Sequence, residues 1–378
     1  MMAPKKVFIH SPELDLYPYP PECPFNTSRA GRTHGIAKSM GLLAGADRSV
    51  ISAPPAERNV LEMYHTADYL DALASAPERQ IDQRLFDMGL GTMDCPVFPG
   101  VYEANALACG GTVKGAQLIA DREATVVFHP AGGLHHAFPD RAAGFCYMND
   151  IVLACMVLAD AGRRVLFLDV DVHHTDGVQE AFYAREDVLT ISMHESGRTL
   201  FPGTGFEGDI GVGSGEGYTV NLPFPADTYD DIYLEAFMEV VVPLVEAFEP
   251  DVLVVEAGAD ALAGDPLAHL CLTNNVYVDI IEALLAAGKP MLVTGGGGYN
   301  IENTVRAWAL LWSCLCGDRG HDDMMAGMGG VMLGSTDWHG GLRDRLLAPS
   351  PETREVVAAD VGAMVEKVKQ NVFPRHGL

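Results

Sequence analysis

The chain lacks several features that would place it outside the ordinary globular enzymes. It has no long, charge-free apolar run, so we expect no membrane-spanning helix and no membrane partner. Residues 1–10 contain two lysines but too short an apolar stretch for a signal-peptide core. The eight cysteines form no CxxC pair and have no zinc-finger spacing. We therefore expect a cytoplasmic protein with reduced thiols, whose first residues form a strand.

Basic residues are also scarce, with 25 Lys and Arg against 51 Asp and Glu, which gives a formal net charge of −26. An acidic surface repels phosphate backbones, so we expect no nucleic-acid partner. It would attract cations such as polyamines or lysine-rich peptides, but its simplest role is to keep the protein soluble. The charge alone therefore does not identify a substrate.

The 378 residues, 48% of them hydrophobic, suit one large α/β domain. Short continuous apolar runs, typical of strands buried on both faces, occur at Thr125–Phe128, Val165–Leu168, Val188–Ser192, Val252–Val255 and Met291–Val293. Helical patterns between them cover Tyr102–Ile119, Asn149–Ala161, Tyr229–Ala247, Asn275–Ala287 and Ile301–Leu315. This alternation predicts a parallel sheet with helices on both faces.

Three stretches are expected to be long loops: His10–Thr27, Pro130–Gly144 and Met193–Gly217. Loops of this length in a compact domain are usually functional. We expect a single domain over residues 1–378. Residues 317–378 would be its appendage, made of a Gly- and Met-rich patch followed by a helix.

The strongest chemical signal follows the run VLFL. Asp169, Asp171 and His173 recur with period two, so their side chains should leave one face at the end of a buried strand. Two carboxylates and an imidazole are costly to bury without a partner, and a divalent cation removes that cost. A salt-bridged strand end would need basic residues nearby, whereas His174 and Asp176 follow. The pattern therefore predicts a metal site.

Other strand ends carry chemistry too, as expected where ligands bind beyond the carboxyl ends of parallel strands. Asp260 follows VLVV, Tyr299 follows MLV and four glycines, and the pair His135-His136 follows TVVF and a Gly-rich turn. A lone histidine or a lone glycine run is usually structural. The convergence of several strand ends favours one composite site.

These residues resemble a known family, the histone deacetylase superfamily. The ordered motifs are GGLHHA (132–137), GFCYMND (144–150), LDVDVHHTDGV (168–178), LFPGTG (200–205), GADALAGDPL (258–267) and GGGGYN (295–300). The resemblance runs from about residue 7 to residue 316. The segment HESGR (194–198) is most similar to the microbial acetoin-utilisation-protein, class I-like branch. The resemblance to the family implies the three-layer arginase/deacetylase fold, with a parallel eight-stranded sheet between helices.

The resemblance also implies an activity, the hydrolysis of an acetyl or other acyl group from an acylated lysine by metal-activated water. Zinc would be held by Asp171, His173 and Asp260, although such oxygen and nitrogen ligands also admit Fe²⁺ or Mn²⁺. The remaining roles match as follows: His136 is the general base and acid, His135 its electrostatic partner, Asp176 and Asp169 orient these two histidines, and Tyr299 stabilises the oxyanion.

A substrate channel and cation sites are implied in the same way. The channel would involve Gly144, Phe145, Phe201, Leu267, Asp94 and Gly297, with Arg29 beneath it near an internal acetate-release region. One structural potassium site would use Asp169, Asp171, His173, Ser192 and Met193, and a second Phe182, Arg185, Val188 and Tyr218. Without the motifs, Phe145 and Phe201 would be taken for core residues and Asp94 for an ordinary loop residue.

Three alternatives stay open, as does homo-oligomer formation. An acetylpolyamine or other small-molecule amidohydrolase would use the same site; the acidic charge favours it, but Leu267 stands where a polyamine-selective relative has a gatekeeping Glu. An arginase-type ureohydrolase needs two metals, which fits Tyr299 and the paired histidines less well. A non-catalytic acyl-lysine binding module would have lost a ligand, base or tyrosine. Glu256, late in a buried strand, has no partner that the sequence explains.

Overall fold

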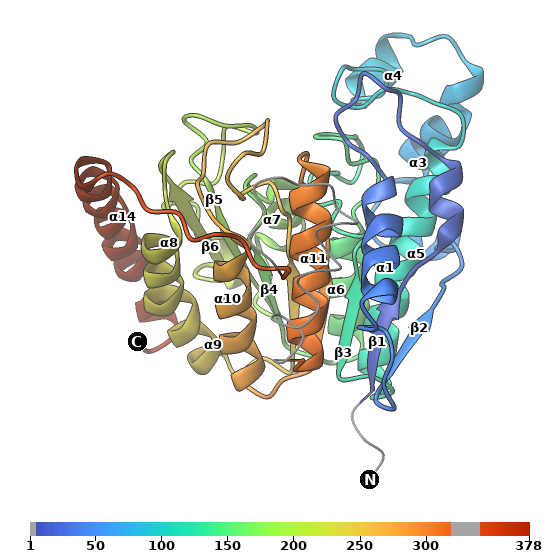
Figure 1. Ribbon diagram of the computed structural model, residues 1–378. Helices are drawn as coiled ribbons and strands as arrows, with labels where there is room; N and C mark the ends of the chain where they lie inside the picture. Colours follow the sequence, from blue (N-terminus) through green and yellow to red (C-terminus); the bar gives the residue numbers. More distant parts are fainter. Residues whose placement is uncertain (1–4, 319–340) are drawn as a thin grey trace.

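The centre of the molecule is a parallel β-sheet (Figure 1). The structure is a computed structural model that describes residues 5–318 and 341–378. Within these residues eight strands pair in the order β2-β1-β3-β8-β7-β4-β5-β6, and every neighbouring pair is parallel. The strands are β1 (Lys6–Ile9), β2 (Arg48–Ile51), β3 (Val126–His129), β4 (Val165–Asp169), β5 (Val188–Glu195), β6 (Thr219–Phe224), β7 (Val252–Glu256) and β8 (Met291–Thr294). The predicted fold class is confirmed.

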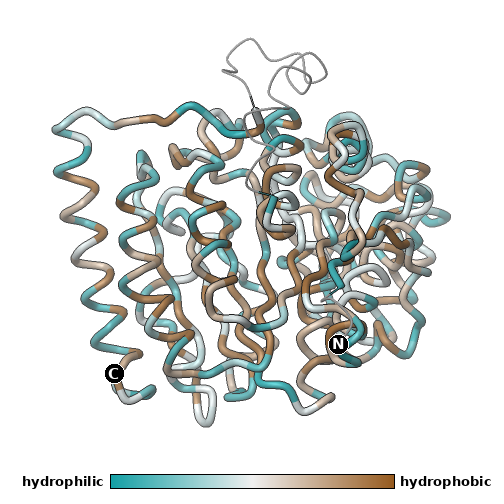
Figure 2. Tube along the Cα trace, turned by 60° about the horizontal axis from the view of Figure 1, so that its bottom comes forward, coloured by the Kyte–Doolittle hydropathy of each residue, from teal (hydrophilic) through white to brown (hydrophobic). Residues whose placement is uncertain are grey.

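Side chains that alternate along the central strands enter two separate cores. Leu166 and Leu168 of β4 belong to the core that packs against α1 (Ser28–Ser39), α10 (Asn274–Ala286) and α11 (Ile301–Cys316). Val165 and Phe167 belong to the opposite core, which packs against α5 (Val101–Ala120), α6 (Asp150–Asp160) and α7 (Asp176–Phe182). Because both faces are buried, the central strands are apolar up to their carboxyl ends, and Figure 2 shows hydrophobic residues along the interior of the trace.

The helix expected over Tyr229–Ala247 is interrupted. It consists of α8 (Asp230–Ala236), the π-helical turn η4 (Phe237–Val241) and α9 (Val242–Phe248). Pro243 lies in the first turn of α9 and cannot donate the regular backbone hydrogen bond to the preceding turn. The widened turn accommodates this missing donor.

The loop expected over Met193–Gly217 begins too early. Met193, His194 and Glu195 continue β5, because they pair with Leu222, Pro223 and Phe224 of β6. β6 carries Asn221 and Pro223, which break the apolar run that marks the other strands. The sequence pattern therefore does not mark β6, the strand with which the last three residues of β5 pair.

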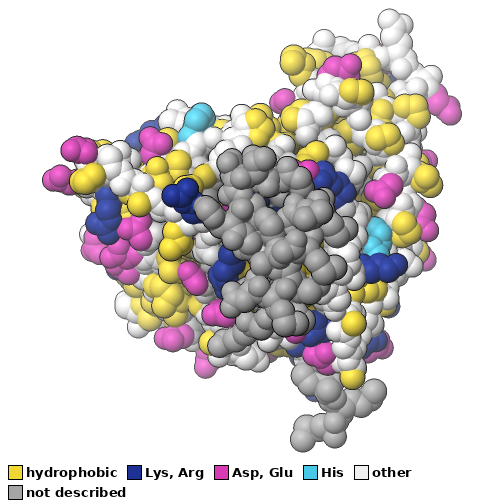
Figure 3. Space-filling model, in the orientation of Figure 1, with side chains coloured by type: hydrophobic (Ala, Val, Ile, Leu, Met, Phe, Trp, Pro, Cys, Tyr) yellow, Lys and Arg dark blue, Asp and Glu magenta, His cyan; other side chains and the backbone are white. Residues whose placement is uncertain are grey.

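The remaining elements are mostly short: η1 (Pro12–Leu16), α2 (Arg58–Leu61), α3 (Ala67–Ser75), η2 (Ala76–Glu78), α4 (Gln83–Asp87), η3 (Gly213–Gly215) and η5 (Phe373–Arg375). The long helix α14 (Pro351–Val372) packs on β6 and α8, where Figure 3 shows acidic side chains gathered on the left. In the two described ranges, no helix is long and apolar enough to cross a membrane. The expected Gly- and Met-rich patch lies largely outside the described residues.

Candidate active site

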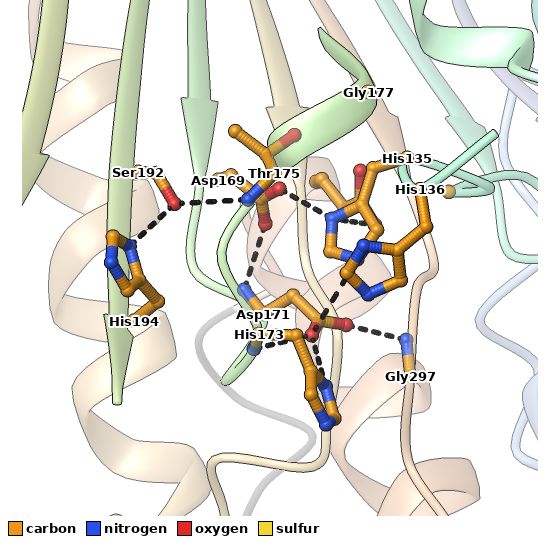
Figure 4. A network of polar contacts seen from close by, with 12 residues as sticks. His135, His136, Asp169, Asp171, His173, Thr175, Gly177, Ser192, His194 and Gly297 are labelled. Atoms are coloured by element: carbon orange, nitrogen blue, oxygen red, sulfur yellow. Dashed lines mark hydrogen bonds and ion pairs between the residues drawn. The ribbon is translucent and has the colours of Figure 1, made fainter. Parts of the chain in front are cut away.

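Asp171, His173 and Asp260 form a compact, buried group beyond the ends of β4 and β7. Their potential ligand atoms all lie within 4.8 Å of one another. The Nδ1 atom of His173 is 3.1 Å from Asp171 Oδ1 and 3.1 Å from Asp260 Oδ2. Figure 4 shows His173 beside Asp171, with His135 and His136 reaching the same place from another loop. The structure thus brings together the three residues expected to hold the metal.

Backbone N–H groups hold this ligand group in place. Gly297 N donates to Asp171 Oδ2 over 2.6 Å, and Val172 N donates to Asp260 Oδ1 over 3.0 Å. A Cβ atom on Gly297 would lie 1.9 Å from Asp260 Oδ2, and one on Gly258 would lie 2.0 Å from Asp171 Oδ2. Glycine is therefore required at both positions for the backbone to close around the two carboxylates.

The electrostatics of this group suit a divalent cation. Burial and the neighbouring charge of Asp171 raise the pKa of Asp260 to about 7. Burial opposes a positive charge on His173, but its hydrogen bonds to Asp171 and Asp260 raise its pKa to about 10. The group therefore attracts positive charge. Two carboxylates and one imidazole are a donor set that fits Zn²⁺, Fe²⁺ or Mn²⁺.

Asp169 does not join this group but a second one beside it. Its Oδ2 atom lies 2.8 Å from His135 Nδ1, and Oε1 of Glu256 lies 3.2 Å from the same nitrogen. β4 ends at Asp169, so Asp171 and His173 no longer follow the strand geometry. Their side chains therefore join Asp260, whereas that of Asp169 joins His135 and Glu256. The His135 ring thereby links the two groups, with Nε2 4.0 Å from Asp171 Oδ1.

Glu256 thus has a neighbour that the sequence did not reveal. It ends β7 directly beside Asp169 of β4, is fully buried, and neither carboxylate oxygen has a hydrogen-bond partner among the described residues. Burial and the charge of Asp169 raise the pKa of Glu256 well above its usual range. Burial lowers the pKa of His135, but the charges of Asp169 and Asp171 outweigh this and raise it to about 9.

His136 is held in a different electrostatic state from its neighbour. Its Nδ1 atom donates to Asp176 Oδ1 over 2.7 Å, at the first residue of α7. Burial and the nearby charge of His135 lower the pKa of His136 to about 4, against the opposing effect of Asp176. At neutral pH His136 is therefore neutral, and its free Nε2 atom can accept a proton.

Two residues that sequence reasoning left without a role shape the loop of the paired histidines. Asp150 accepts hydrogen bonds from Gly133 N (3.0 Å) and Leu134 N (2.7 Å), and also from the Thr112 hydroxyl. Asn149 donates its side-chain amide to His135 O over 2.9 Å. Both belong to the motif GFCYMND, and the polar pair at the start of a predicted helix was the available signal.

The glycine run before Tyr299 is fixed from beneath by Arg29. The buried guanidinium donates to Gly298 O over 2.7 Å and to Gly296 O over 3.0 Å. Arg29 also lines a small hollow, together with Tyr19, Leu134 and Trp308. On the other side, Asp265 accepts from Tyr299 N over 2.7 Å, which sequence reasoning also missed. Burial and the charge of Asp260 raise the pKa of Tyr299, which keeps its hydroxyl protonated.

Three of the six expected channel residues, Gly144, Phe145 and Phe201, lie around His136 and Tyr299. A Cβ atom on Gly144 would lie 2.4 Å from His136 Cδ2 and 3.0 Å from Phe201 Cε1, so this glycine permits the close approach. The ring of Phe201 is 5.0 Å from His136, and that of Phe145 is 5.7 Å from Tyr299. Asp94 is exposed in the loop after α4, away from the contacts that join these residues.

The residues expected at the first monovalent-cation site surround the loop after β4. Asp169 Oδ1 accepts from Asp171 N over 2.9 Å, and the Ser192 hydroxyl lies 2.8 Å from His194 Nδ1. The Met193 carbonyl accepts from the Tyr233 hydroxyl over 2.9 Å. The second set has Phe182 at the end of α7, Val188 at the start of β5 and Tyr218 before β6, and Arg185 N donates to Phe182 O over 2.9 Å.

Comparison with known proteins agrees with this geometry. The histone deacetylase domain profile matches residues 23–315. The acetoin utilization protein AcuC of Bacillus subtilis is 41% identical over 325 residues, which cover 84% of this chain and 84% of that protein. Histone deacetylase RPD3 of Saccharomyces cerevisiae is 36% identical over 304 residues, which cover 80% of this chain and 69% of the relative.

A solved structure gives the same result. The crystal structure of an HDAC homologue from Aquifex aeolicus superimposes with a TM-score of 0.86 at 30% identity and covers 97% of this chain and 100% of that one. A structure of an HDAC homologue complexed with SAHA superimposes equally well, at 29% identity. The extent of these matches confirms the resemblance drawn from the motifs: the chain belongs to the histone deacetylase family of amide hydrolases.

Proposed function

We propose that the chain is a zinc-dependent deacylase that removes an acetyl group from the side chain of an acylated lysine. The observation that carries this proposal is the juxtaposition of the ligand group Asp171, His173 and Asp260 with two differently charged histidines, His135 and His136. When bound, a divalent metal supplies Lewis-acid chemistry, since it polarises a carbonyl group and acidifies water.

The roles of the chain's own groups follow from their protonation states. Neutral His136 takes a proton from the attacking water at Nε2 while Nδ1 stays bonded to Asp176, and it then gives that proton to the leaving amine. Asp176 keeps the ring in the required tautomer. His135, bonded to Asp169, presents positive charge beside the developing negative charge. The protonated Tyr299 hydroxyl donates a hydrogen bond to the oxyanion.

Substrate shape is set by the walls near this centre. Phe145 and Phe201 provide aromatic surface for a lysine stem, Leu267 an apolar mouth, and Asp94 a rim acid for the substrate backbone. The hollow beside Arg29 would receive the released acetate. We further propose potassium at the two sets of residues around β4 and β5, as a structural cation.

An assay panel tests the proposal. Purified protein supplied with Zn²⁺, Fe²⁺ or Mn²⁺ should hydrolyse an acetyl-lysine peptide, and Asp171→Asn should not. The panel includes longer acyl-lysines, acetylpolyamines and small acetylated amines. Selective hydrolysis of acetylpolyamines would reassign the substrate, and no hydrolysis with any metal would contradict the deacylase activity itself.

A further inference from the structure

Glu195, the last residue of β5, is a buried carboxylate outside the catalytic group. Its side chain is 0% exposed, and both of its oxygens are occupied by hydrogen bonds. Oε2 accepts from His269 N over 2.8 Å, and Oε1 accepts from His269 Nδ1 over 2.9 Å and from Thr199 Oγ1 over 3.0 Å. Such a carboxylate is costly to bury, and its three donors offset that cost only while both contacting segments stay in place.

The two segments that Glu195 joins carry two residues of the proposed channel, Phe201 and Leu267. Thr199 lies two residues before Phe201, whose ring stands 5.0 Å from His136. His269 lies two residues after Leu267, the residue expected at the channel mouth. One carboxylate therefore spans from the loop that carries the aromatic wall to the loop that carries the aliphatic one.

Both ends of this connection are tied to the reaction centre. The backbone N–H of Glu195 donates to Val172 O over 2.8 Å, and Val172 lies between the ligands Asp171 and His173. In the second loop, Asp265 accepts from Leu267 N over 2.9 Å and from Tyr299 N over 2.7 Å. The position of the mouth is thereby fixed relative to the metal ligands on one side and to Tyr299 on the other.

We infer that Glu195 is a positioning residue that sets the width of the channel mouth by joining the Phe201 loop to the Leu267 loop. This inference rests on the proposed function, since the mouth is defined by an acyl-lysine substrate. Glu195 contacts no reacting group, so its loss would loosen the binding of the lysine stem and leave the chemistry at His136 and Tyr299 in place. Substrate affinity, more than turnover, depends on it.

Two exposed partners allow a test that avoids burying a new group. Thr199→Val keeps the side-chain volume but removes the hydroxyl donor, and His269→Ala removes the ring donor. Each should raise KM for an acetyl-lysine peptide by up to about tenfold, because one of the hydrogen bonds that hold the two loops to Glu195 is lost, with kcat within about twofold. The matched controls Thr199→Ser and His269→Asn keep a donor at nearly the same place and should restore KM.

The double variant sharpens the result. Because both donors act through Glu195, the KM of the Thr199→Val/His269→Ala protein should rise by less than the product of the single effects. Single variants with unchanged KM, or with kcat falling while KM stays constant, would overturn the inference although the wild type is active. A wild type inactive with every metal would instead contradict the proposed function, so the two failures are distinguishable.

Discussion

Two groups of carboxylates and imidazoles lie side by side in the interior, and their negative charge is compensated in different ways. In the group of Asp171, His173 and Asp260, backbone donors from Gly297, His173 and Val172 hold the oxygens around a common point. In the group of His135, Asp169 and Glu256, two carboxylates face one ring nitrogen, and Glu256 receives no hydrogen bond from any residue that the structure describes.

The first group is suited to binding a cation, whereas the second compensates its charge by taking up protons. The first group is arranged in advance for a cation, because its oxygens are already fixed and oriented. The second compensates its excess charge by protonation, with the pKa of His135 raised to about 9 and that of Glu256 raised further above its usual range. Similar residue types, a few ångströms apart, thus support two functions.

The largest expected effect comes from breaking the first group. Asp171→Asn removes a charged ligand that is also bonded to Gly297 N and His173 N. We expect the variant to lose its stoichiometric metal and its activity to fall to the limit of detection. Metal analysis by mass spectrometry together with peptide hydrolysis checks this, and a variant that keeps bound metal and turnover would remove Asp171 from the ligand set.

Tyr299→Phe should separate catalysis from metal binding. Among the described residues, the hydroxyl of Tyr299 forms no hydrogen bond with Asp171, His173 or Asp260, so we expect unchanged metal content. Loss of the oxyanion donor should lower kcat by about 10²- to 10³-fold. A near-normal rate constant for the hydrolysis step in single-turnover experiments would exclude Tyr299 from the reaction.

Asp176→Asn tests the protonation state of His136. The carboxylate raises the pKa of His136 against burial and the charge of His135, so its removal lowers that pKa further. We expect kcat to drop about 10- to 100-fold and the acid limb of its pH profile to move to lower pH. An acid limb that stays in place would show that another group titrates there.

Glu256→Gln should have the smallest effect on activity and a visible effect on stability. The folded pKa of Glu256 lies above its unfolded value, because burial and Asp169 disfavour the charged form. Such a carboxyl group destabilises the fold progressively as pH rises above the unfolded pKa. Metal-free Glu256→Gln should therefore unfold at a higher temperature than metal-free wild type at pH 8, with the difference narrowing toward pH 5. A lower melting temperature at pH 8 would show that the charged carboxylate stabilises the protein.

The sequence predicted central strands far better than peripheral ones. β4, β7 and β8 are buried on both faces and form continuous apolar runs. β2 and β6 lie at the two edges of the sheet, where Arg48 and Ser49 or Asn221 and Pro223 interrupt the pattern. An edge strand leaves one side without a partner strand, so it tolerates proline and polar residues that a central strand does not.

The same limit applies to the site. Asp171, His173 and Asp260 could be predicted to lie together because strand ends and family motifs mark them. The surroundings of Glu256 and the pairing of Glu195 with His269 depend on contacts between residues far apart in the chain, and no local pattern encodes them. The motifs therefore indicated the chemistry, whereas the charge states and the connection across the channel mouth required the structure.

The most direct test of the central claim is a metal titration of chelator-treated protein, followed by hydrolysis of an acetyl-lysine peptide. The proposed mechanism predicts that activity returns in proportion to added Zn²⁺ and saturates near one equivalent per chain, with no recovery in Asp171→Asn. Hydrolysis that persists without metal, or that fails to return with Zn²⁺, Fe²⁺ or Mn²⁺, would contradict it.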